Sequence, residues 1–153
     1  MRKALKLAEL AASHDEVPVG ALLVAADGLT ILGRGINRRE QWQTPLGHAE
    51  LITLHRASQK QSAWRLTGST LYVTLEPCLM CAGALVQARV TRVVYGAKDP
   101  KGGAVHSLYQ VLQDQRLNHR CKVTAGILEQ ECGLILTQYF RHKRLQKKFL
   151  ADK

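Results

Sequence analysis

The sequence predicts an α/β protein with three layers, α/β/α, built on a central mixed sheet that has an antiparallel hairpin at its edge. Segments with the two-residue period of strands alternate along the chain with segments of helical period. Such alternation implies crossover connections, which place helices on both faces of a sheet. The first two strand segments instead flank Asp27-Gly28, a dipeptide typical of tight hairpin turns, so they should pair antiparallel.

The expected elements of the N-terminal half are two helices with a hairpin between them. Ala4, Ala8 and Ala11 recur at helical spacing, so residues 2–14 should form an amphipathic helix. The two arms of the hairpin should be residues 17–26 and 29–36, with Gly33 and Gly35 loosening the end of the second arm. A polar, irregular segment follows at residues 37–47, and residues 48–59 should form the next helix.

The C-terminal half continues the alternation. Residues 69–75 are rich in β-branched side chains and should form a buried strand, followed by a helix at 79–87 and a strand at 92–95. A loop that contains Pro100, Gly102 and Gly103 leads into a short helix at 107–112. Residues 122–124 are a candidate short strand, and residues 129–149 a long last helix.

Length and composition favour one domain over residues 1–153. With 153 residues, 46% of them apolar, the chain can bury one sizeable core and is short for two. We expect no membrane partner, because no segment resembles a signal peptide and no apolar run approaches the roughly eighteen residues of a membrane span. Of the four cysteines, Cys78 and Cys81 form a metal-ligand motif, and Cys121 and Cys132 are isolated in the sequence. This pattern favours free thiols in a reducing, cytoplasmic location over disulfide bonds.

Cys78 and Cys81 have the spacing of metal ligands. They follow Pro77 at the start of an expected helix, where both sulfurs can point at one position and the helix dipole favours thiolates. Two soft anionic ligands suit zinc, with His48 as the candidate third ligand and a fourth position left for water. Other readings remain open at this point, since such a pair can be a redox pair or two buried thiols, and a lone histidine is often a core residue.

The combination of motifs is more specific than its parts. His48-Ala49-Glu50, followed about thirty residues later by Pro-Cys-x-x-Cys, matches the general signature of zinc-dependent nucleoside and nucleobase deaminases. In hydrolytic deamination, water attacks the ring carbon that carries an amine, so the water must be activated and a carboxyl group beside the metal must move the proton. Glu50 fits this role. Its alternative role is a carboxylate that merely favours the helix N-terminus.

A strong excess of basic residues is the second signal. There are 22 Lys and Arg against 12 Asp and Glu, which favours a polyanionic partner over an unspecialised basic surface. Aromatic residues make up only 5%, which argues against an exposed stacking platform. The positive charge is densest in residues 141–153. These residues either contact phosphates or form a solvated helix end. They include one acidic residue, Asp152, and six basic residues: Arg141, Lys143, Arg144, Lys147, Lys148 and Lys153.

Over nearly its whole length, the sequence resembles the bacterial tRNA-specific adenosine deaminases of the cytidine deaminase-like superfamily. The matching segments occur in the family's order: Val17-Pro18-Val19-Gly20-Ala21, Gly35-Ile36-Asn37-Arg38, His48-Ala49-Glu50, Leu71-Tyr72-Val73-Thr74-Leu75-Glu76-Pro77-Cys78, Met80-Cys81-Ala82-Gly83-Ala84, Gly96-Ala97-Lys98-Asp99, Asn118-His119-Arg120 and Gly126-Ile127-Leu128.

This resemblance implies a zinc-dependent hydrolase that converts the wobble adenosine in the anticodon of an arginine tRNA to inosine. It implies one zinc ion per subunit, held by His48, Cys78 and Cys81, with Glu50 as the proton shuttle. The family works as a homodimer, with active sites close to the subunit interface.

The resemblance also implies the contacts to the anticodon stem-loop. Asn37 would hydrogen-bond the flipped adenosine, Val19 would line its pocket, and Asp99 would lie along the loop backbone. Two features depart from the family pattern. Ile36 stands where an aromatic residue is common, which puts a stacking role there in doubt, and residues 27–30 carry a small insertion in the hairpin turn.

Two other classes of function are weighed against this one. A deaminase of a free base or nucleoside, of guanine or cytidine type, would keep the zinc motif but would not need such a basic surface. A pure binding module with a structural zinc would close the fourth position with another Cys or His and would have no use for Glu50. The sequence therefore favours the tRNA enzyme.

Overall fold

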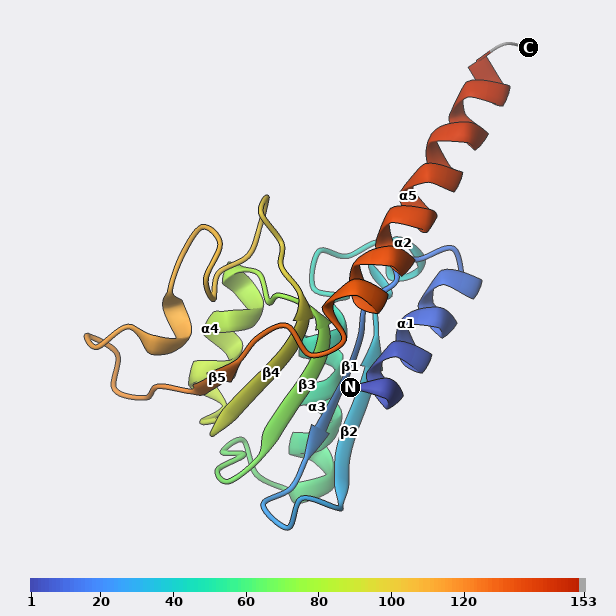
Figure 1. The fold of residues 1–153 in the computed structure, drawn as a ribbon. Coiled ribbons are helices and arrows are strands. Elements are labelled where there is room, and N and C mark those ends of the chain that lie inside the picture. The colour runs from blue at the N-terminus through green and yellow to red at the C-terminus, as the bar shows by residue number, and fades with distance from the viewer. Residues whose placement is uncertain (152–153) are drawn as a thin grey trace.

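The computed structural model describes residues 1–151 and is built on a five-stranded mixed sheet with helices on both faces (Figure 1). The strands lie in the order β2-β1-β3-β4-β5, with β1 antiparallel to β2 and β3, and with β3, β4 and β5 parallel. The layers and the antiparallel edge hairpin confirm the predicted fold class. The strands are β1 (Gly20–Val24), β2 (Ile31–Ile36), β3 (Thr70–Leu75), β4 (Arg92–Ala97) and β5 (Lys122–Thr124).

The helices form the two outer layers. Helix α1 and the first turns of α5 cover one face of the sheet, and α3 and α4 cover the other (Figure 1). A short helix, α2, lies between β2 and α3, and a single 3-10 turn, η1, precedes β5. The bounds are α1 (Arg2–Ser13), α2 (Arg39–Trp42), α3 (Ala49–Gln61), α4 (Leu79–Gln87), η1 (Val111–Gln113) and α5 (Glu129–Ala151).

Alternation along β1 divides the core between the two faces of the sheet. Ala21 and Leu23 belong to the main cluster, together with apolar side chains of α3 and α4. Leu22 and Val24 point the other way and pack with Ala4 of α1 in a second, smaller cluster. This is the two-residue period expected of a strand with apolar layers on both sides.

Two glycines of β2 bring α3 close to the sheet. A Cβ atom at Gly35 would lie 2.2 Å from the Ala49 carbonyl oxygen, and one at Gly33 would lie 2.4 Å from the Thr53 carbonyl oxygen. Only glycine permits this approach of two backbones. Rather than loosening the strand, these residues let α3 begin against the end of β2, which positions His48 at the edge of the sheet.

Some predicted elements differ from those observed. Strand β1 is shorter than residues 17–26, and the polar segment 37–47 contains the unpredicted helix α2. The helix predicted at 107–112 is wrong: Ser107 donates its backbone N–H and its hydroxyl to the Glu76 carboxylate, and the segment turns once as η1 only at Val111–Gln113. For α2 and for the segment before η1, the deciding hydrogen bonds are made with residues distant in sequence, Glu16 and Glu76.

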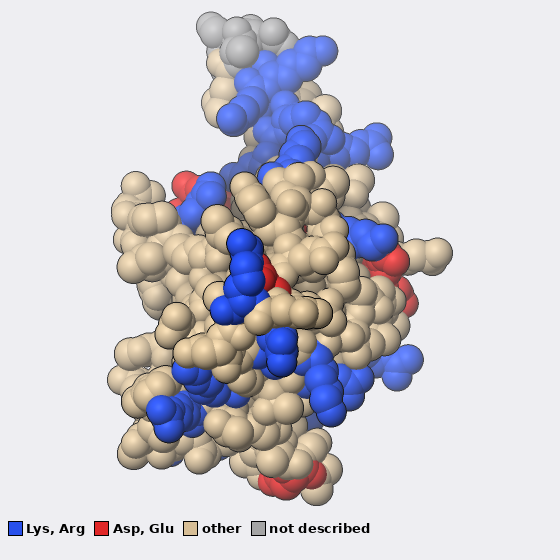
Figure 2. All heavy atoms as spheres, turned by 90° about the vertical axis from the view of Figure 1, so that its left-hand side faces the viewer, with Lys and Arg blue, Asp and Glu red and all other residues tan. Residues whose placement is uncertain are grey.

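The last turns of α5 project beyond the body of the molecule (Figure 1). Lys and Arg side chains cover much of this projecting part in Figure 2. Asp152 and Lys153, which belong to the basic run noted in the sequence, lie outside the described residues. Within residues 1–151, no helix has both the length and the apolar character that a membrane span needs.

Candidate active site

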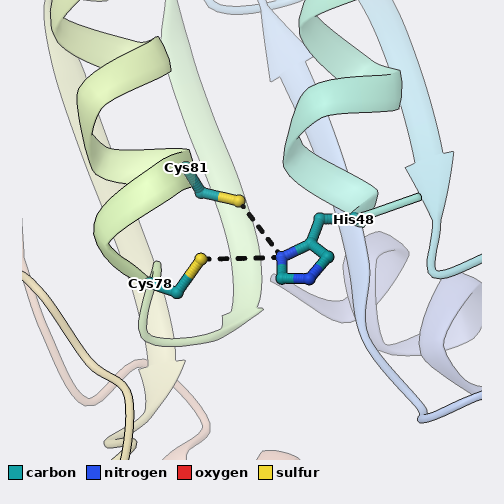
Figure 3. A group of neighbouring side chains, drawn as sticks. All are labelled: His48, Cys78 and Cys81. Atoms are coloured by element: carbon teal, nitrogen blue, oxygen red, sulfur yellow. Dashed lines mark hydrogen bonds between the residues drawn. The ribbon is translucent and has the colours of Figure 1, made fainter. Parts of the chain in front are cut away.

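Two helix N-termini meet at the edge of the sheet formed by the carboxyl ends of β2 and β3. His48 is the N-cap residue of α3, with extended φ and ψ of −80° and 142°, and Cys78 is the N-cap residue of α4, with −73° and 175°. Neither side chain makes a capping hydrogen bond to its own helix. Both point instead into the space between the helices, where Cys81 from the first turn of α4 joins them (Figure 3).

The three side chains form one compact group of donor atoms. The Nδ1 atom of His48 lies 3.6 Å from the Sγ atom of Cys78 and 3.4 Å from the Sγ atom of Cys81. All three atoms lie within 4.8 Å of one another, and among the described residues this is the group that can hold a metal ion. The structure thus brings together the three residues that the sequence nominated as ligands.

The two thiols have different proton affinities. The hydrogen bond from Cys81, together with that from His48, outweighs burial and lowers the pKa of Cys78 to about 4. The same contact with Cys78, added to burial, raises the pKa of Cys81. The hydrogen bond to Cys78 also raises the pKa of His48. At neutral pH the group therefore already contains a thiolate, as a soft-metal site requires.

Glu50 lies in the first turn of α3, beside this group, and is only 4% exposed. Burial raises the pKa of its carboxyl group to about 7, against the opposing effects of its own backbone N–H and of His48. A group with a pKa near 7 can both accept and release a proton at neutral pH. Its position and its pKa suit the role that the sequence suggested.

A pocket of about 130 Å³ opens in front of these residues. A closed cavity of about 150 Å³ holds a benzene ring, so this open pocket suits a group of the size of one heterocyclic base. Cys81 is buried behind the wall. The other six candidate residues all line the pocket: Val19, Asn37, His48, Glu50, Cys78 and Asp99.

Glu76, another residue of the pocket wall, holds the loop that carries Asp99. Its carboxylate is 2% exposed. Burial disfavours its charge, but the hydrogen bonds outweigh burial and lower its pKa to about 2. It accepts five of them, from the backbone N–H groups of Asp99 (3.0 Å), Val105 (3.1 Å), His106 (2.7 Å) and Ser107 (2.9 Å) and from the Ser107 hydroxyl (2.5 Å).

Neither Glu76 nor Glu16 is among the residues that the sequence predicted for the site. Glu16 is fully buried and accepts a hydrogen bond from the side chain of Asn37. A signal existed for both residues, since each is an acidic residue at the boundary of an apolar segment. Glu16, which follows Asp15, precedes Val17-Pro18, and Glu76 follows Leu75. A charge in such a place needs a buried set of partners, although the sequence does not say which.

The two departures from the family pattern lie away from this pocket. Ile36 is buried and lines a separate hollow together with Leu10 of α1. The residues of the inserted hairpin turn join the far ends of β1 and β2, where the Asp27 carboxylate accepts the backbone N–H groups of Leu29 (2.9 Å) and Thr30 (2.8 Å). Neither feature contacts the candidate metal ligands.

A basic groove adjoins the pocket. Val17 and Arg39 line both, so the two hollows are neighbours. The groove measures about 460 Å³ and runs between α5 and the segment that follows α1. Its remaining lining residues are Asp15, Glu40, Tyr139, Phe140, Lys143, Arg144 and Lys147.

A second, apolar hollow lies on the outer side of α3. It measures about 530 Å³ and is lined by Leu51 and Ile52, which directly follow Glu50, and by Trp42 and Leu46. Trp42 is 50% exposed and Leu46 59% exposed, values that are high for large apolar side chains.

Both a family profile and individual relatives that match this chain are deaminases. The sequence profile of the MafB19-like deaminase family matches residues 1–144. A tRNA-specific adenosine deaminase of Bacillus subtilis (strain 168) is 48% identical over 148 residues, which cover 97% of this chain and 91% of the relative.

Solved structures agree with the sequence matches. A structure from a study of A-to-I editing by tRNA:A34 deaminases at the wobble position of transfer RNA is 43% identical, with a TM-score of 0.84; it covers 89% of this chain and 97% of its own. The guanine deaminase of Nitrosomonas europaea is 22% identical, with a TM-score of 0.79 over 90% of this chain and 81% of its own. This second likeness concerns the fold alone.

Proposed function

The chain belongs to the family of tRNA-specific adenosine deaminases, and on that premise we propose that it converts the wobble adenosine in the anticodon of an arginine tRNA to inosine, with release of ammonia. One observation carries the proposal: His48, Cys78 and Cys81 converge beside Glu50 at the bottom of a pocket that suits a single base. As a tRNA-modifying enzyme, the protein is expected to work in the cytoplasm.

The donor set fits one zinc ion per chain. With zinc bonded to sulfur at about 2.3 Å and to nitrogen at about 2.0–2.1 Å, a tetrahedral angle separates the two donor atoms by about 3.5 Å. The measured separations of 3.4 and 3.6 Å between His48 Nδ1 and the two sulfurs agree with this value. Three protein ligands leave one position for the reacting water, as in catalytic rather than structural zinc sites.

Glu50 is the residue that moves the proton in this proposal. When bound, zinc supplies a hydroxide nucleophile at neutral pH. The Glu50 carboxylate takes the first proton of the water and passes it to the ring nitrogen. It then carries the second proton, from the hydroxyl group now bonded to the ring carbon, to the amine, which departs as ammonia. Its low exposure keeps bulk water from competing for that proton, and its pKa of about 7 matches both steps.

The substrate base must leave its stack to reach this pocket. Splaying out a nucleotide costs a few kcal/mol and is easiest in a single-stranded loop, which an anticodon offers. Asn37 and Val19 then contact the base, while Asp99 lies along the backbone. The basic groove beside Arg39 gives the flanking phosphates a place next to the pocket.

A product assay separates the candidate functions. We expect the zinc-loaded protein to form inosine in an arginine tRNA, and sequencing should place the inosine at the wobble position. Free adenosine and free guanine, incubated in parallel, should yield little inosine or xanthine. Xanthine from free guanine, with no inosine in the tRNA, would favour the free-base deaminase instead.

We also propose that the chain forms a homodimer through the apolar hollow on α3. The exposed Trp42 and Leu46 supply the apolar area, and the hollow begins one residue after Glu50, so an interface there would lie close to the active site. Sedimentation should give a dimer for the wild type and a monomer for a Trp42→Glu and Leu46→Glu double variant. Trp64→Glu, equally exposed but outside the hollow, is the control and should stay dimeric. A monomeric wild type at micromolar concentration would exclude this interface.

A further inference from the structure

Glu16 is an acidic residue that makes an unusual set of buried contacts in this basic protein. It follows α1, is 0% exposed, and lies directly before Val17 of the pocket wall. Its carboxylate accepts three hydrogen bonds, all from N–H groups: Nδ2 of Asn37 at 3.3 Å, the backbone of Glu40 at 3.2 Å and the backbone of Gln41 at 2.6 Å. These donors lie more than twenty residues further along the chain, so Glu16 joins α1 to the opposite wall of the pocket.

The backbone of Asn37 is already fixed without Glu16. Its N–H donates to the carbonyl oxygen of Val19 at 3.0 Å, which continues the β1–β2 pairing by one step. What the backbone does not fix is the rotation of the side-chain amide. An amide can turn by about 180° and exchange its oxygen and nitrogen at little steric cost, so its orientation follows from its hydrogen-bond partners.

A carboxylate settles that orientation because it has no hydrogen to donate. Only the NH₂ side of Asn37 can face Glu16. One amide hydrogen of Asn37 then bonds to Glu16. The second N–H and the amide oxygen face the pocket in a single, fixed orientation. Within residues 1–151, no buried side-chain N or O atom lacks a hydrogen-bond partner. The amide oxygen of Asn37 is therefore not buried without a partner, and because Asn37 lines the pocket, a ligand can reach that oxygen.

We propose that Glu16 is a positioning residue for base selection: it holds the Asn37 amide in the one orientation that matches the donors and acceptors of adenine. This proposal rests on the proposed function, in which Asn37 contacts the base. Glu16 does not line the pocket and acts through Asn37. By holding the N–H groups of Glu40 and Gln41, it also fixes the first turn of α2, from which Arg39 reaches the pocket.

The decisive variant is Glu16→Gln, which keeps the size of the side chain but brings an NH₂ group among three N–H donors. Asn37 is then free to turn over. For a stem-loop with adenosine at the target position, we expect kcat/KM to fall about ten- to hundred-fold, the range for a lost buried hydrogen bond to a charged group. Discrimination against the same stem-loop with cytidine at that position should weaken, while zinc content stays at one per chain.

A double-mutant cycle separates positioning from a general loss of structure. If Glu16 acts through Asn37, Glu16→Gln should have little further effect on discrimination in an Asn37→Ala background. Glu9→Gln is the matched control, because it makes the same chemical change at an exposed site of α1 and leaves the contacts of Glu16 intact. Unchanged discrimination in Glu16→Gln, or additive losses in the cycle, would overturn the proposal.

A measurement on the wild type does not depend on activity or on a stable variant. The side-chain NH₂ signals of Asn37 in a ¹⁵N NMR spectrum should be resolved, protected from solvent exchange and slow to rotate. Rapid rotation and exchange would overturn the positioning role even if inosine is formed. Conversely, a protected amide in a protein that forms no inosine would leave the hydrogen-bond role standing and would contradict the proposed function.

Discussion

Glu50 and Glu76 are two buried carboxylates that line the same pocket as the metal-binding group, yet their pKa values are displaced in opposite directions. Glu50 lies two residues after His48, and burial raises its pKa to about 7. Glu76 lies two residues before Cys78, and five donated hydrogen bonds outweigh burial and lower its pKa to about 2.

The number of N–H and O–H donors, rather than burial, decides the difference. A carboxylate whose lone pairs are all occupied stays ionised and fixed, and so it serves as an anchor. A carboxylate with few donors keeps a proton available near neutral pH and can exchange it with a substrate. We therefore expect Glu76 to stabilise the loop around the pocket and Glu50 to transfer protons during the reaction.

The largest effect is expected from removing a ligand of the metal-binding group formed by His48, Cys78 and Cys81. Cys78→Ser or Cys81→Ser should lose zinc and deaminase activity together, because a hydroxyl replaces a thiolate and leaves an incomplete site. Metal content can be measured by atomic emission on the same samples that are assayed. Cys121→Ser, a change to a buried thiol outside the group, is the control and should keep both. Full zinc occupancy in the two ligand variants would disprove the assignment.

A loss of stability should distinguish Glu76 from Glu50. Glu76→Gln leaves at least one of the buried N–H groups facing an NH₂ group, and an unsatisfied buried donor costs about 1–3 kcal/mol. The melting temperature should fall, and amide exchange should rise in residues 99–107, while zinc is retained. Glu9→Gln, an exposed carboxylate on α1, should change neither quantity. An unaltered melting temperature in Glu76→Gln would remove its role as an anchor.

The pH dependence of stability should have opposite signs for the two residues in metal-free protein. For Glu76 the folded pKa lies below the ordinary value of 4.5, so its contribution is present above pH 4.5 and is lost as the pH falls toward 2. For Glu50 the folded pKa lies above 4.5, so stability declines as the pH rises from 4.5 to about 7. Urea midpoints measured across this pH range should show two effects. Glu76→Gln should reduce the loss of stability as the pH falls below 4.5, and Glu50→Gln should reduce the loss of stability as the pH rises from 4.5 to about 7. Identical pH profiles in both variants would contradict the comparison.

The smallest effect on chemistry is expected from α5, which contains neither carboxylate. Replacing Arg141, Arg144, Lys147 and Lys148 by Ala should weaken tRNA binding and reduce the slope of log K against log salt by about 0.7–0.9 per lost phosphate contact. The saturated rate on a minimal stem-loop should survive. The control removes four exposed cations elsewhere, Arg2, Lys3, Lys6 and Lys122. An equal change of slope in both variants would show that only the total charge matters.

The sequence predicted best those features that are local in the chain. The spacing of Cys78 and Cys81 at a helix start, and the His-x-Glu motif before α3, led to the right cluster because each half of the site lies within four residues. The same holds for the layers of the fold and for the hairpin, whose turn is marked by Asp27-Gly28. The roles of the clustered residues in catalysis stay predictions.

The features that the sequence did not predict depend on hydrogen bonds between residues that are far apart in the chain. Helix α2 forms where Glu16, more than twenty residues earlier, accepts its first N–H groups, and the segment after Gly103 is shaped by Glu76. Periodicity does not report such contacts, because a buried acid has the same local pattern whichever donors it meets. For this reason the sequence did not reveal the buried acids Glu16 and Glu76, whereas it predicted the cluster of His48, Cys78 and Cys81.

The most direct test of the central claim is the turnover of Glu50→Ala on arginine tRNA, with zinc content and tRNA affinity measured on the same preparation. We expect one zinc per chain, unchanged tRNA binding and a rate of inosine formation lower by at least the 10²- to 10⁴-fold typical of a lost general acid–base group. A near-normal rate in a zinc-loaded Glu50→Ala variant would rule out Glu50 as the proton shuttle, because another group would then have to move the proton.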